Sequence, residues 1–332
     1  PPPRDAGATP SRPAPGQHGP ASPAPPTWAA LLGAGDGPLR TQRELSLPVH
    51  AAARARLYED LSLGERASLA ACHGHGAAAW LSALPTPGVT GTAISGVAMH
   101  AAVRLWLGAP PRSTPPGARC RCGAAVGVDG RQFLGTCAVQ RGRHMRLHNH
   151  LVQLVAAALR RSGVWGSVVV EVGLDGARAA LRPDLRATRT STGGVAWGDV
   201  SVTSPFPTAL VSRVAVAPLR AVAAETREAY KVSKYAPALP ASNPPHTFTP
   251  LVWEVYGRVG PQTADWFRTA LGVPGQSAGR QSLLTAASVA LWRSNARGVV
   301  DGYGACFGSR DPPGLGAEGP IGSGLNSVRV GE

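Results

Sequence analysis

The segment GGVAWGDVSVTSP, residues 193–205, decides the fold class of this chain. It is rich in Val and Thr and is bounded by Gly and Pro, which is typical of a β-strand. Asp199 lies in the middle of this strand. Because an unpartnered buried carboxylate costs free energy, the segment predicts both a sheet and a partner for Asp199.

Regular elements are predicted on both sides of this strand. On its N-terminal side we expect an amphipathic helix over residues 148–163, then strands over SVVVEVG (167–173) and ARAALRPDL (177–185). On its C-terminal side we expect helices over residues 216–236, 261–272 and 279–300 and a strand over residues 246–257. This order predicts an α/β fold in which helices flank one sheet.

The composition divides the whole chain into five parts. Residues 1–26 hold ten prolines and no apolar periodicity, which is typical of a disordered segment. We predict a disordered Pro-rich tail (1–27), a helical linker region (28–119), a Cys/His knuckle (120–150), the α/β domain (148–306) and a loose Gly/Pro-rich tail (307–332).

The net charge of +14 suits a polyanionic partner such as nucleic acid. Asp and Glu are also scarce, so the charge alone does not prove such a partner. No apolar run is long enough for a membrane span and no signal segment opens the chain, so we expect a soluble intracellular protein with no membrane partner.

Lys231 and Lys234 are the only two lysines among 33 Lys and Arg residues. A lysine ammonium is a compact charge whose pKa can shift, whereas an arginine guanidinium is a planar fork that stays charged. Three residues apart on a helix, the two lysines share one face and can aim at one site. Chance survival on a solvated helix face is the open alternative.

Three acidic residues fall on the predicted strands: Glu171, Asp184 in RPD and Asp199 in GDV. If adjacent strands place these carboxylates side by side, they repel unless a divalent cation is present. Oxygen ligands of this kind select Mg²⁺ or Mn²⁺. Asp184 could instead cap a turn, and Glu171 could be an outward-facing edge residue.

Three cysteines, Cys120, Cys122 and Cys137, fall within 18 residues. Thiolates at such spacing suit a structural zinc, which needs a fourth ligand. The alternative is that they are small buried thiols.

Five segments in order resemble a known family: CRCGAAVGVDGRQFLGTC (120–137), RLHNHLVQLV (146–155), LRPDL (181–185), GDVSV (198–202) and KVSKY (231–235). They look like the restriction-like PD-(D/E)XK endonuclease at the C-terminus of early-branching non-long-terminal-repeat retrotransposons, with its preceding zinc knuckle. The resemblance covers about residues 45–270. It implies a mixed sheet flanked by helices, preceded by a helical linker and a small knuckle.

The resemblance also implies a function: a metal-dependent endonuclease that nicks target DNA for integration of the element. Asp184 and Asp199 would be the Mg²⁺ or Mn²⁺ ligands, Lys231 or Lys234 the catalytic lysine, and Glu171 an auxiliary acid. The usual motif places its lysine where this chain has Ser201, so here the lysine would come from the following helix.

Two departures from the family pattern concern the knuckle and the helix after it. Gln132 stands where the family has its zinc-ligating His, so His144 or His148 would have to substitute. Leu147 stands where the family has an Arg before His148 and Asn149, a segment that engages DNA. The expected nucleic-acid contacts are Arg141, Arg143, Arg146, His148, Asn149 and Arg182. A helix start capped by Asn149 and a solvated basic loop are the alternatives.

The resemblance implies further partners and a location. DNA is the expected substrate, element RNA is a possible second ligand, and a reverse transcriptase would lie upstream in the same polyprotein. A nuclear location follows, and the lack of a polymerase signature predicts no polymerase activity. The alternatives are a catalytically inactive nucleic-acid-binding remnant and an arginine-rich helical interaction protein.

Overall fold

The computed structural model describes residues 42–83, 94–109, 117–127, 130–134, 137–171, 173, 181–239, 246–271 and 277–307. The predicted tail at residues 1–27 and nearly all of that at 307–332 lie outside this part. The chain forms two compact units, Pro1–Ser62 and Leu63–Glu332. Within the described residues, no helix is both long and apolar enough to cross a membrane.

The first unit contributes helix α2 (Gln42–Asp60). Pro48 lies inside this helix, where its ring removes one backbone hydrogen bond. The Arg54 guanidinium lies 5.6 Å from the centroid of the Tyr58 ring, one turn further along.

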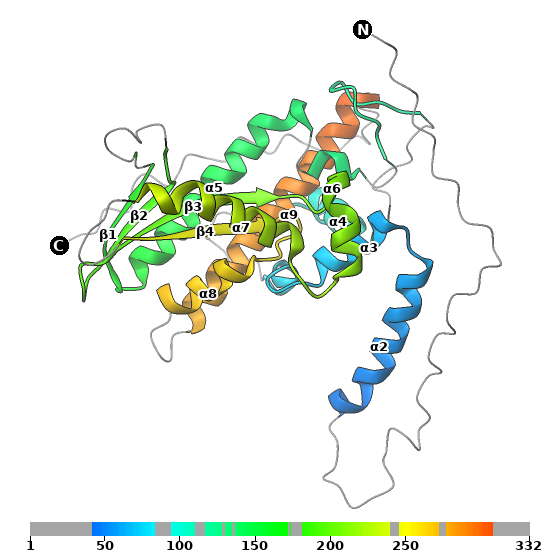
Figure 1. Ribbon diagram of the computed structural model, residues 1–332. Coiled ribbons are helices and arrows are strands. Elements are labelled where there is room, and N and C mark those ends of the chain that lie inside the picture. Colours follow the sequence, from blue (N-terminus) through cyan, green and yellow to red (C-terminus); the bar gives the residue numbers. More distant parts are fainter. Residues whose placement is uncertain are drawn as a thin grey trace, which may run out of the picture. The chain divides into compact units, whose positions relative to one another are not determined.

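The second unit has a mixed α/β architecture (Figure 1). Its strands are β1 (Trp165–Val170), β2 (Leu185–Arg189), β3 (Val195–Thr203) and β4 (Thr247–Glu254). Its α-helices are α3 (Leu63–Cys72), α4 (Gly96–Trp106), α5 (Arg141–Arg161), α6 (Thr208–Val216), α7 (Val222–Tyr235), α8 (Pro261–Ala270) and α9 (Ser277–Phe307). Short 3₁₀ turns lie at Ala79–Ser82, Arg131–Leu134, Ala138–Gln140 and Ala236–Ala238.

The four strands form one sheet in the order β1-β2-β3-β4. The first two pairings are antiparallel and the β3–β4 pairing is parallel, so the sheet is mixed. Pro250 lies on β4, an edge strand, where the lack of a backbone N–H is tolerated. The prediction of an α/β fold with one sheet is confirmed.

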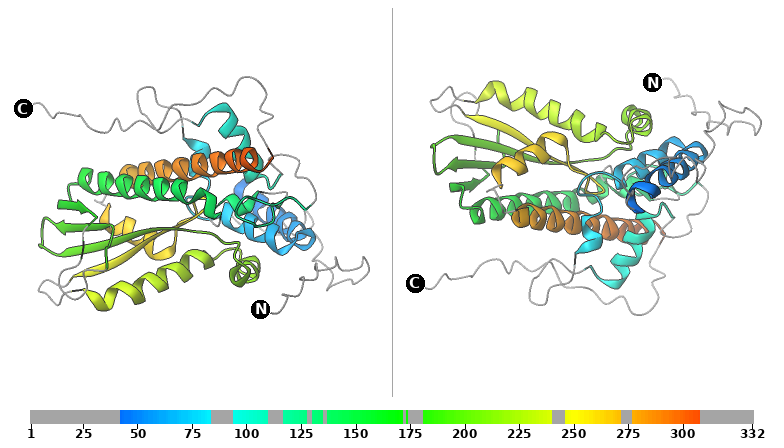
Figure 2. Two further views of the ribbon diagram at one scale, coloured as in Figure 1. Left: turned by 90° about the horizontal axis from the view of Figure 1, so that it is seen from above. Right: turned by 90° about the horizontal axis from the view of Figure 1, so that it is seen from below.

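Helices cover both faces of this sheet. Figure 2 shows α5 and α9 side by side on one face and α7 on the other. On β3, Ala196 and Val200 pack into the core under α5 and α9, whereas Trp197 packs into a small cluster on the opposite face. Since side chains alternate along a strand, Asp199 shares the side of Trp197 and points toward α7.

A second core joins the N-terminal part of this unit to α9. The rings of Trp80 and Tyr256 both stack on Trp292 of α9, at centroid distances of 5.0 and 5.3 Å. Phe133 and Leu134 of the predicted knuckle belong to the same core. The predicted boundaries at residues 119 and 150 therefore fall inside one compact unit.

Two strand boundaries differ from the predictions. The predicted strand at 177–185 was misplaced: β2 spans Leu185–Arg189, residues 181–184 form no strand, and residues 177–180 lie outside the described part. Pro183 offers no backbone donor for the ladder, which opposes a strand there. The strand predicted at 167–173 begins at Trp165 and ends at Val170, because Glu171 adopts a positive φ of 58°.

Four helices also differ from the predictions. Helix α7 begins at Val222 rather than at residue 216, and α9 spans Ser277–Phe307 rather than 279–300. Helix α5 begins at Arg141 rather than at residue 148, so Asn149 lies within the helix and does not cap it. Helix α6, Thr208–Val216, was not predicted. Its sequence TALVSRVAV is rich in β-branched residues, which are weak helix formers, and its formation follows from packing against α3.

Glu254, the last residue of β4, is fully buried. Its Oε1 accepts a hydrogen bond from the backbone N–H of Ala224, at 3.3 Å. Burial raises the pKa of this carboxyl group from 4.5 to about 7, although the positive charge of Arg258 acts in the opposite direction. In the folded state Glu254 therefore holds a proton at pH values where it is ionised in the unfolded chain.

This burial predicts a pH dependence of stability. Because the folded pKa is raised, the contribution of Glu254 is fully present below pH 4.5, declines as the pH rises and is lost above about 7. The loss is on the order of 3 kcal/mol. Urea unfolding of Glu254→Gln from pH 4.5 to 8 should show a flatter pH dependence than wild type. Asp265→Asn, an exposed change on α8, is the control, and equal slopes in wild type and Glu254→Gln would contradict the assignment.

Candidate functional site

Three acidic residues lie at one level of the sheet: Glu171 directly after β1, Asp184 directly before β2, and Asp199 within β3. The last β2–β3 pair is Leu185 with Gly198, so the next step along the antiparallel ladder brings Asp184 opposite Asp199. The backbone N–H of Glu171 donates to the carbonyl oxygen of Asp184 at 2.9 Å, which continues the β1–β2 register. The sheet therefore places Asp184, directly before β2, level with Asp199 on the neighbouring strand β3.

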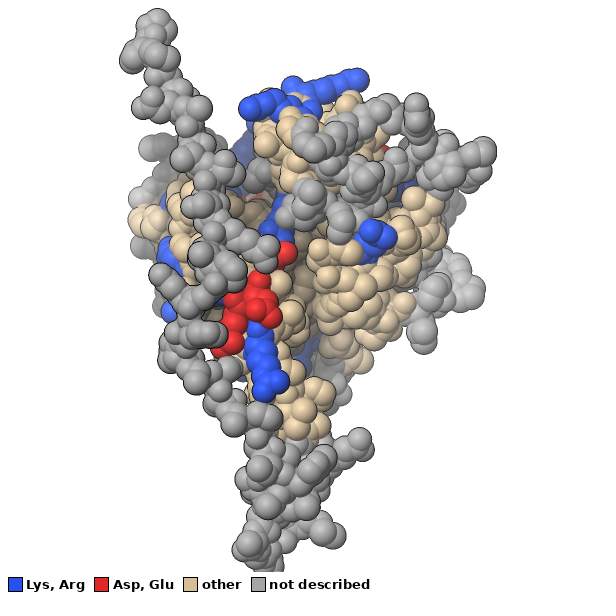
Figure 3. All heavy atoms as spheres, turned by 90° about the vertical axis from the view of Figure 1, so that its right-hand side faces the viewer, with Lys and Arg blue, Asp and Glu red and all other residues tan. Residues whose placement is uncertain are grey.

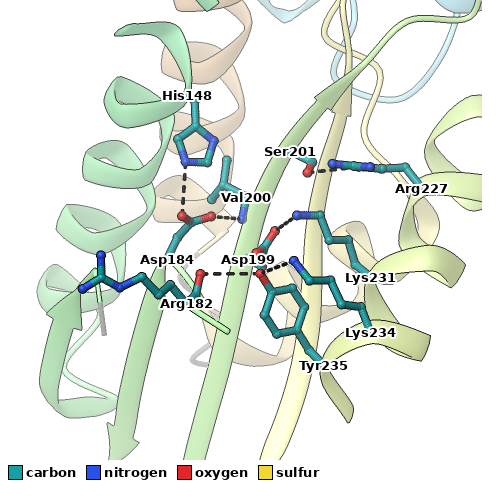
Figure 4. A network of polar contacts seen from close by, with 10 residues as sticks. All are labelled: His148, Arg182, Asp184, Asp199, Val200, Ser201, Arg227, Lys231, Lys234 and Tyr235. Carbon is teal, nitrogen blue, oxygen red and sulfur yellow. Dashed lines mark hydrogen bonds and ion pairs between the residues drawn. The ribbon is translucent and has the colours of Figure 1, made fainter. Parts of the chain in front are cut away.

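Each of the two carboxylate oxygens of Asp184 makes a hydrogen bond with a different partner (Figure 4). Its Oδ1 lies 3.1 Å from Nε2 of His148 on α5. Its Oδ2 accepts the backbone N–H of Val200 at 2.6 Å, so the side chain continues the hydrogen bonding of β3 beyond the end of β2. The hydrogen bond that His148 makes to the Asp184 carboxylate raises the pKa of His148 and outweighs the effect of burial, which lowers it.

Asp199 is paired with Lys231 of α7. The Lys231 Nζ forms an ion pair with Asp199 Oδ2 that lacks hydrogen-bond geometry. The Lys231 side chain is 10% exposed and that of Asp199 is 4% exposed, so the pair is buried. Of the two lysines, Lys231 is therefore the one that contacts an acid of the site.

The spacing of α7 matches that of β3. Arg227 Nε donates to the Ser201 hydroxyl at 3.3 Å, and Lys231, one turn later, pairs with Asp199. Four residues of helix rise about 6 Å and two residues of strand about 6.6 Å, so successive turns of α7 meet alternate residues of β3. The helix thus supplies a cation to Asp199 and another to Ser201 on β3.

Lys234 and Tyr235 complete the network in Figure 4. Lys234 is exposed and its ammonium donates to the Tyr235 hydroxyl at 3.2 Å. That hydroxyl in turn donates to the carbonyl oxygen of Arg182 at 3.5 Å. Burial raises the pKa of Tyr235, and the carboxylate of Asp199 raises it further. Both lysine ammonium groups lie over the Tyr235 ring.

Helix α7 is held in place by a buried carboxylate one turn before Lys231. Glu228 accepts hydrogen bonds from the backbone N–H and the hydroxyl of Thr263, both at 3.0 Å, at the start of α8. The Thr263 hydroxyl also accepts the N–H of Val252 on β4. A Cβ at Gly260 would lie 2.2 Å from Glu228 Oε1, so this close approach requires glycine. Glu228 thereby links α7, α8 and β4.

The other predicted residues of the site lie at different positions. Glu171 is exposed and is not part of the network in Figure 4. Its backbone adopts the left-handed conformation, which is uncommon for residues other than glycine. Arg182 presents its backbone carbonyl to Tyr235, and its side chain is exposed. Among the predicted nucleic-acid contacts on α5, Arg141, Arg146 and Asn149 are exposed.

Unlike the exposed Arg141 and Arg146 on α5, Arg143 makes its hydrogen bonds to groups within the protein. Its guanidinium donates to the carbonyl oxygens of Ser294 and Phe133 and to the side chain of Gln140. Burial lowers its pKa to about 10, although the charge of Asp301 opposes this change. The structure therefore gives Arg143 a role in holding α5 against α9.

The predicted zinc ligands form a second candidate site. The sulfur atoms of Cys120, Cys122 and Cys137 all lie within 4.8 Å of one another. The Cys120–Cys137 and Cys122–Cys137 sulfur distances are 3.6 and 3.9 Å. In the part of the chain that the structure describes, no other group of three His, Cys, Asp or Glu ligand atoms lies so close. This cluster could hold a metal such as zinc.

Neither predicted fourth ligand joins the three thiols. His148 binds Asp184, and His144 Nε2 lies 3.0 Å from the Arg143 guanidinium. Burial and then the charge of Arg143 lower the pKa of His144. Instead, Cys306 near the end of α9 packs against the same hydrophobic core as Cys122. Sequence reasoning did not include Cys306, because no local pattern links it to a partner so far away in the chain.

Figure 3 shows Lys and Arg side chains on the surface of the described residues.

No protein-family model matches this sequence, and a comparison with curated proteins finds no relative. What the site can do chemically therefore follows from its residues and their geometry.

The buried ion pair predicts a strong coupling between Asp199 and Lys231. Lys231→Met should lower the free energy of unfolding by about 3–5 kcal/mol, because it leaves Asp199 buried without a countercharge. The double variant Asp199→Asn/Lys231→Met should recover at least roughly 1 kcal/mol of that loss. Urea denaturation measures both changes.

Lys234→Met is the matched control, since Lys234 is exposed on the same helix and its loss should cost about 0.5 kcal/mol or less. Equal losses in Lys231→Met and Lys234→Met, or strictly additive effects in the double variant, would show that the pair does not couple.

Proposed function

We propose that this chain is a metal-dependent DNA endonuclease of the PD-(D/E)XK type, the nuclear target-nicking module of a retroelement. One observation carries the proposal: Asp184, directly before β2, lies level with Asp199 on β3, and α7 places the Lys231 ammonium on Asp199. This is the set of groups that the family resemblance assigns to catalysis. The order along the chain, acid, acid, then a lysine from a later helix, agrees with that resemblance, and α6 lies between β3 and the lysine-bearing helix α7.

The donor set of the aspartates fits a hard divalent cation. Mg²⁺ is usually held by one or two carboxylates, with waters and substrate phosphates as the remaining ligands. Each carboxylate oxygen has two lone pairs, so an oxygen of Asp184 that accepts one hydrogen bond can still accept another partner. The site offers two carboxylates rather than a full protein cage, because no third His, Cys, Asp or Glu ligand among the described residues completes a group with them.

Asp184 and Asp199 would hold the cation, which supplies Lewis acidity toward a phosphodiester oxygen and lowers the pKa of bound water. Lys231 stabilises the negative charge that develops on the phosphate oxygens, and its burial strengthens this effect. His148 orients Asp184 through its hydrogen bond. Exposed Lys234, Arg146 and Arg182 can contact the DNA backbone.

A nicking assay on supercoiled plasmid DNA with Mg²⁺ or Mn²⁺ tests this proposal. The wild-type chain should convert the plasmid to open circles. Asp184→Asn and Asp199→Asn should each lower the rate by roughly 100-fold or more, and Lys231→Met by roughly 10²–10³-fold, because each removes a group acting on the transition state. Asp265→Asn on α8 should keep the wild-type rate.

Circular dichroism of each variant separates lost chemistry from lost folding, and DNA binding is measured in parallel. If the wild-type chain nicks DNA and neither Asp184→Asn nor Asp199→Asn slows the reaction, the assignment of the site fails.

A second candidate function is nucleic-acid binding without chemistry, as in an inactive remnant of such an element. One observation favours it: protein groups already engage these carboxylates, namely His148 and the Val200 N–H on Asp184 and Lys231 on Asp199. A wild-type chain that binds DNA tightly and does not nick it with either cation would support this candidate.

A further inference from the structure

The three clustered thiols leave a structural zinc site one ligand short. Structural zinc is almost always bound by four ligands in tetrahedral geometry, and Cys120, Cys122 and Cys137 supply three. All three are free thiols rather than disulfides. Their mutual distances of 3.6 and 3.9 Å are those of sulfur atoms that surround a common point.

Cys306 lies next to this group, near the end of α9. Gly302 and Ala305, which precede it on α9, line the hollow beside Cys120 and Cys137. Cys122 and Cys306 also pack against the same hydrophobic core. The Cys306 sulfur does not lie within 4.8 Å of all three others, so binding would require its half-buried side chain to rotate toward them.

The last turns of α9 are held against the knuckle by independent contacts. The rings of Phe133 and Tyr303 lie 5.5 Å apart, and the Tyr303 hydroxyl donates to the carbonyl oxygen of Gly127 at 3.3 Å. A Cβ on Gly302 would lie 2.5 Å from the Phe133 ring, so this close packing requires glycine. Because Cys306 follows one turn after Tyr303, the packing fixes it beside the thiols.

The other candidates for the fourth zinc ligand do not join the three thiols. His144 faces the Arg143 guanidinium and His148 binds Asp184. Gln132, at the position where the family has its His, carries an amide, which is not among the ligands of structural zinc sites. Soft thiolate ligands favour zinc over hard cations, so a fourth thiolate suits this set best.

We propose that Cys120, Cys122, Cys137 and Cys306 bind one Zn²⁺ through four thiolates. Cys306 then ties the end of α9 to the knuckle, across more than half of the chain. Four thiolates around Zn²⁺ leave a net negative charge, and Arg121, Arg143 and Arg146 line the hollow beside Cys120 and Cys137, where they can offset it. This site is independent of the proposed nuclease site.

Zinc binding by the full chain tests the proposal. The wild-type chain should bind one equivalent of Zn²⁺, and with Co²⁺ it should give the absorption bands of tetrahedral four-thiolate coordination. Cys306→Ser should weaken Zn²⁺ affinity by roughly 100-fold or more, because metal affinity depends on the complete ligand set. Cys306→His should restore most of it, and His144→Ala should bind as wild type does.

A second measurement needs no variant. Alkylation of the wild-type chain, read by mass spectrometry, should show that Zn²⁺ protects Cys306 together with Cys120, Cys122 and Cys137. Failure of the wild-type chain to bind Zn²⁺ would overturn the proposal. It would equally be overturned if Zn²⁺ protected the three clustered thiols and left Cys306 reactive, or if His144→Ala lost the metal while Cys306→Ser kept it.

Discussion

A buried carboxylate on the central strand of the sheet constrains this part of the molecule. Asp199 lies in β3, which has strands on both sides and helices on both faces, so water cannot solvate its charge. A cation must therefore accompany it, and Lys231 of α7 does so. The pair sets the position of α7 along β3, because only the turn that carries Lys231 places an ammonium beside the Asp199 carboxylate.

The rest of the site follows from that position. With Lys231 on Asp199, Arg227 reaches Ser201 one turn earlier and Tyr235 lies beside Asp199 one turn later. Glu228, on a neighbouring turn, binds the start of α8 and so ties the helix to β4. Asp184 also belongs to the site, and its carboxylate is held by a hydrogen bond with His148 of α5. Groups from four elements thus meet near the point where β2 ends and β3 continues.

Much of the fold could be predicted from the sequence, because β3 and its neighbours carry clear local patterns. Val-rich and Thr-rich runs predicted β1, β3 and β4, and Asp199 within such a run predicted a partner. The position of β2 could not be predicted as well, since its five residues, LRATR, lack a long apolar run. The choice between Lys231 and Lys234 depends on how α7 rotates against the sheet, which helical spacing alone leaves open. The position of Cys306 beside the knuckle depends on the path of α9. No local spacing in the sequence encodes a contact between segments so far apart.

If Asp184 and Asp199 share one divalent cation, anomalous diffraction from crystals grown with Mn²⁺ should locate it. We expect one strong Mn²⁺ peak about 2 Å from a carboxylate oxygen of each aspartate, with the Lys231 ammonium nearby. A difference map with no Mn²⁺ at this position at saturating concentration, and with Asp199 still bound only by Lys231, would contradict it.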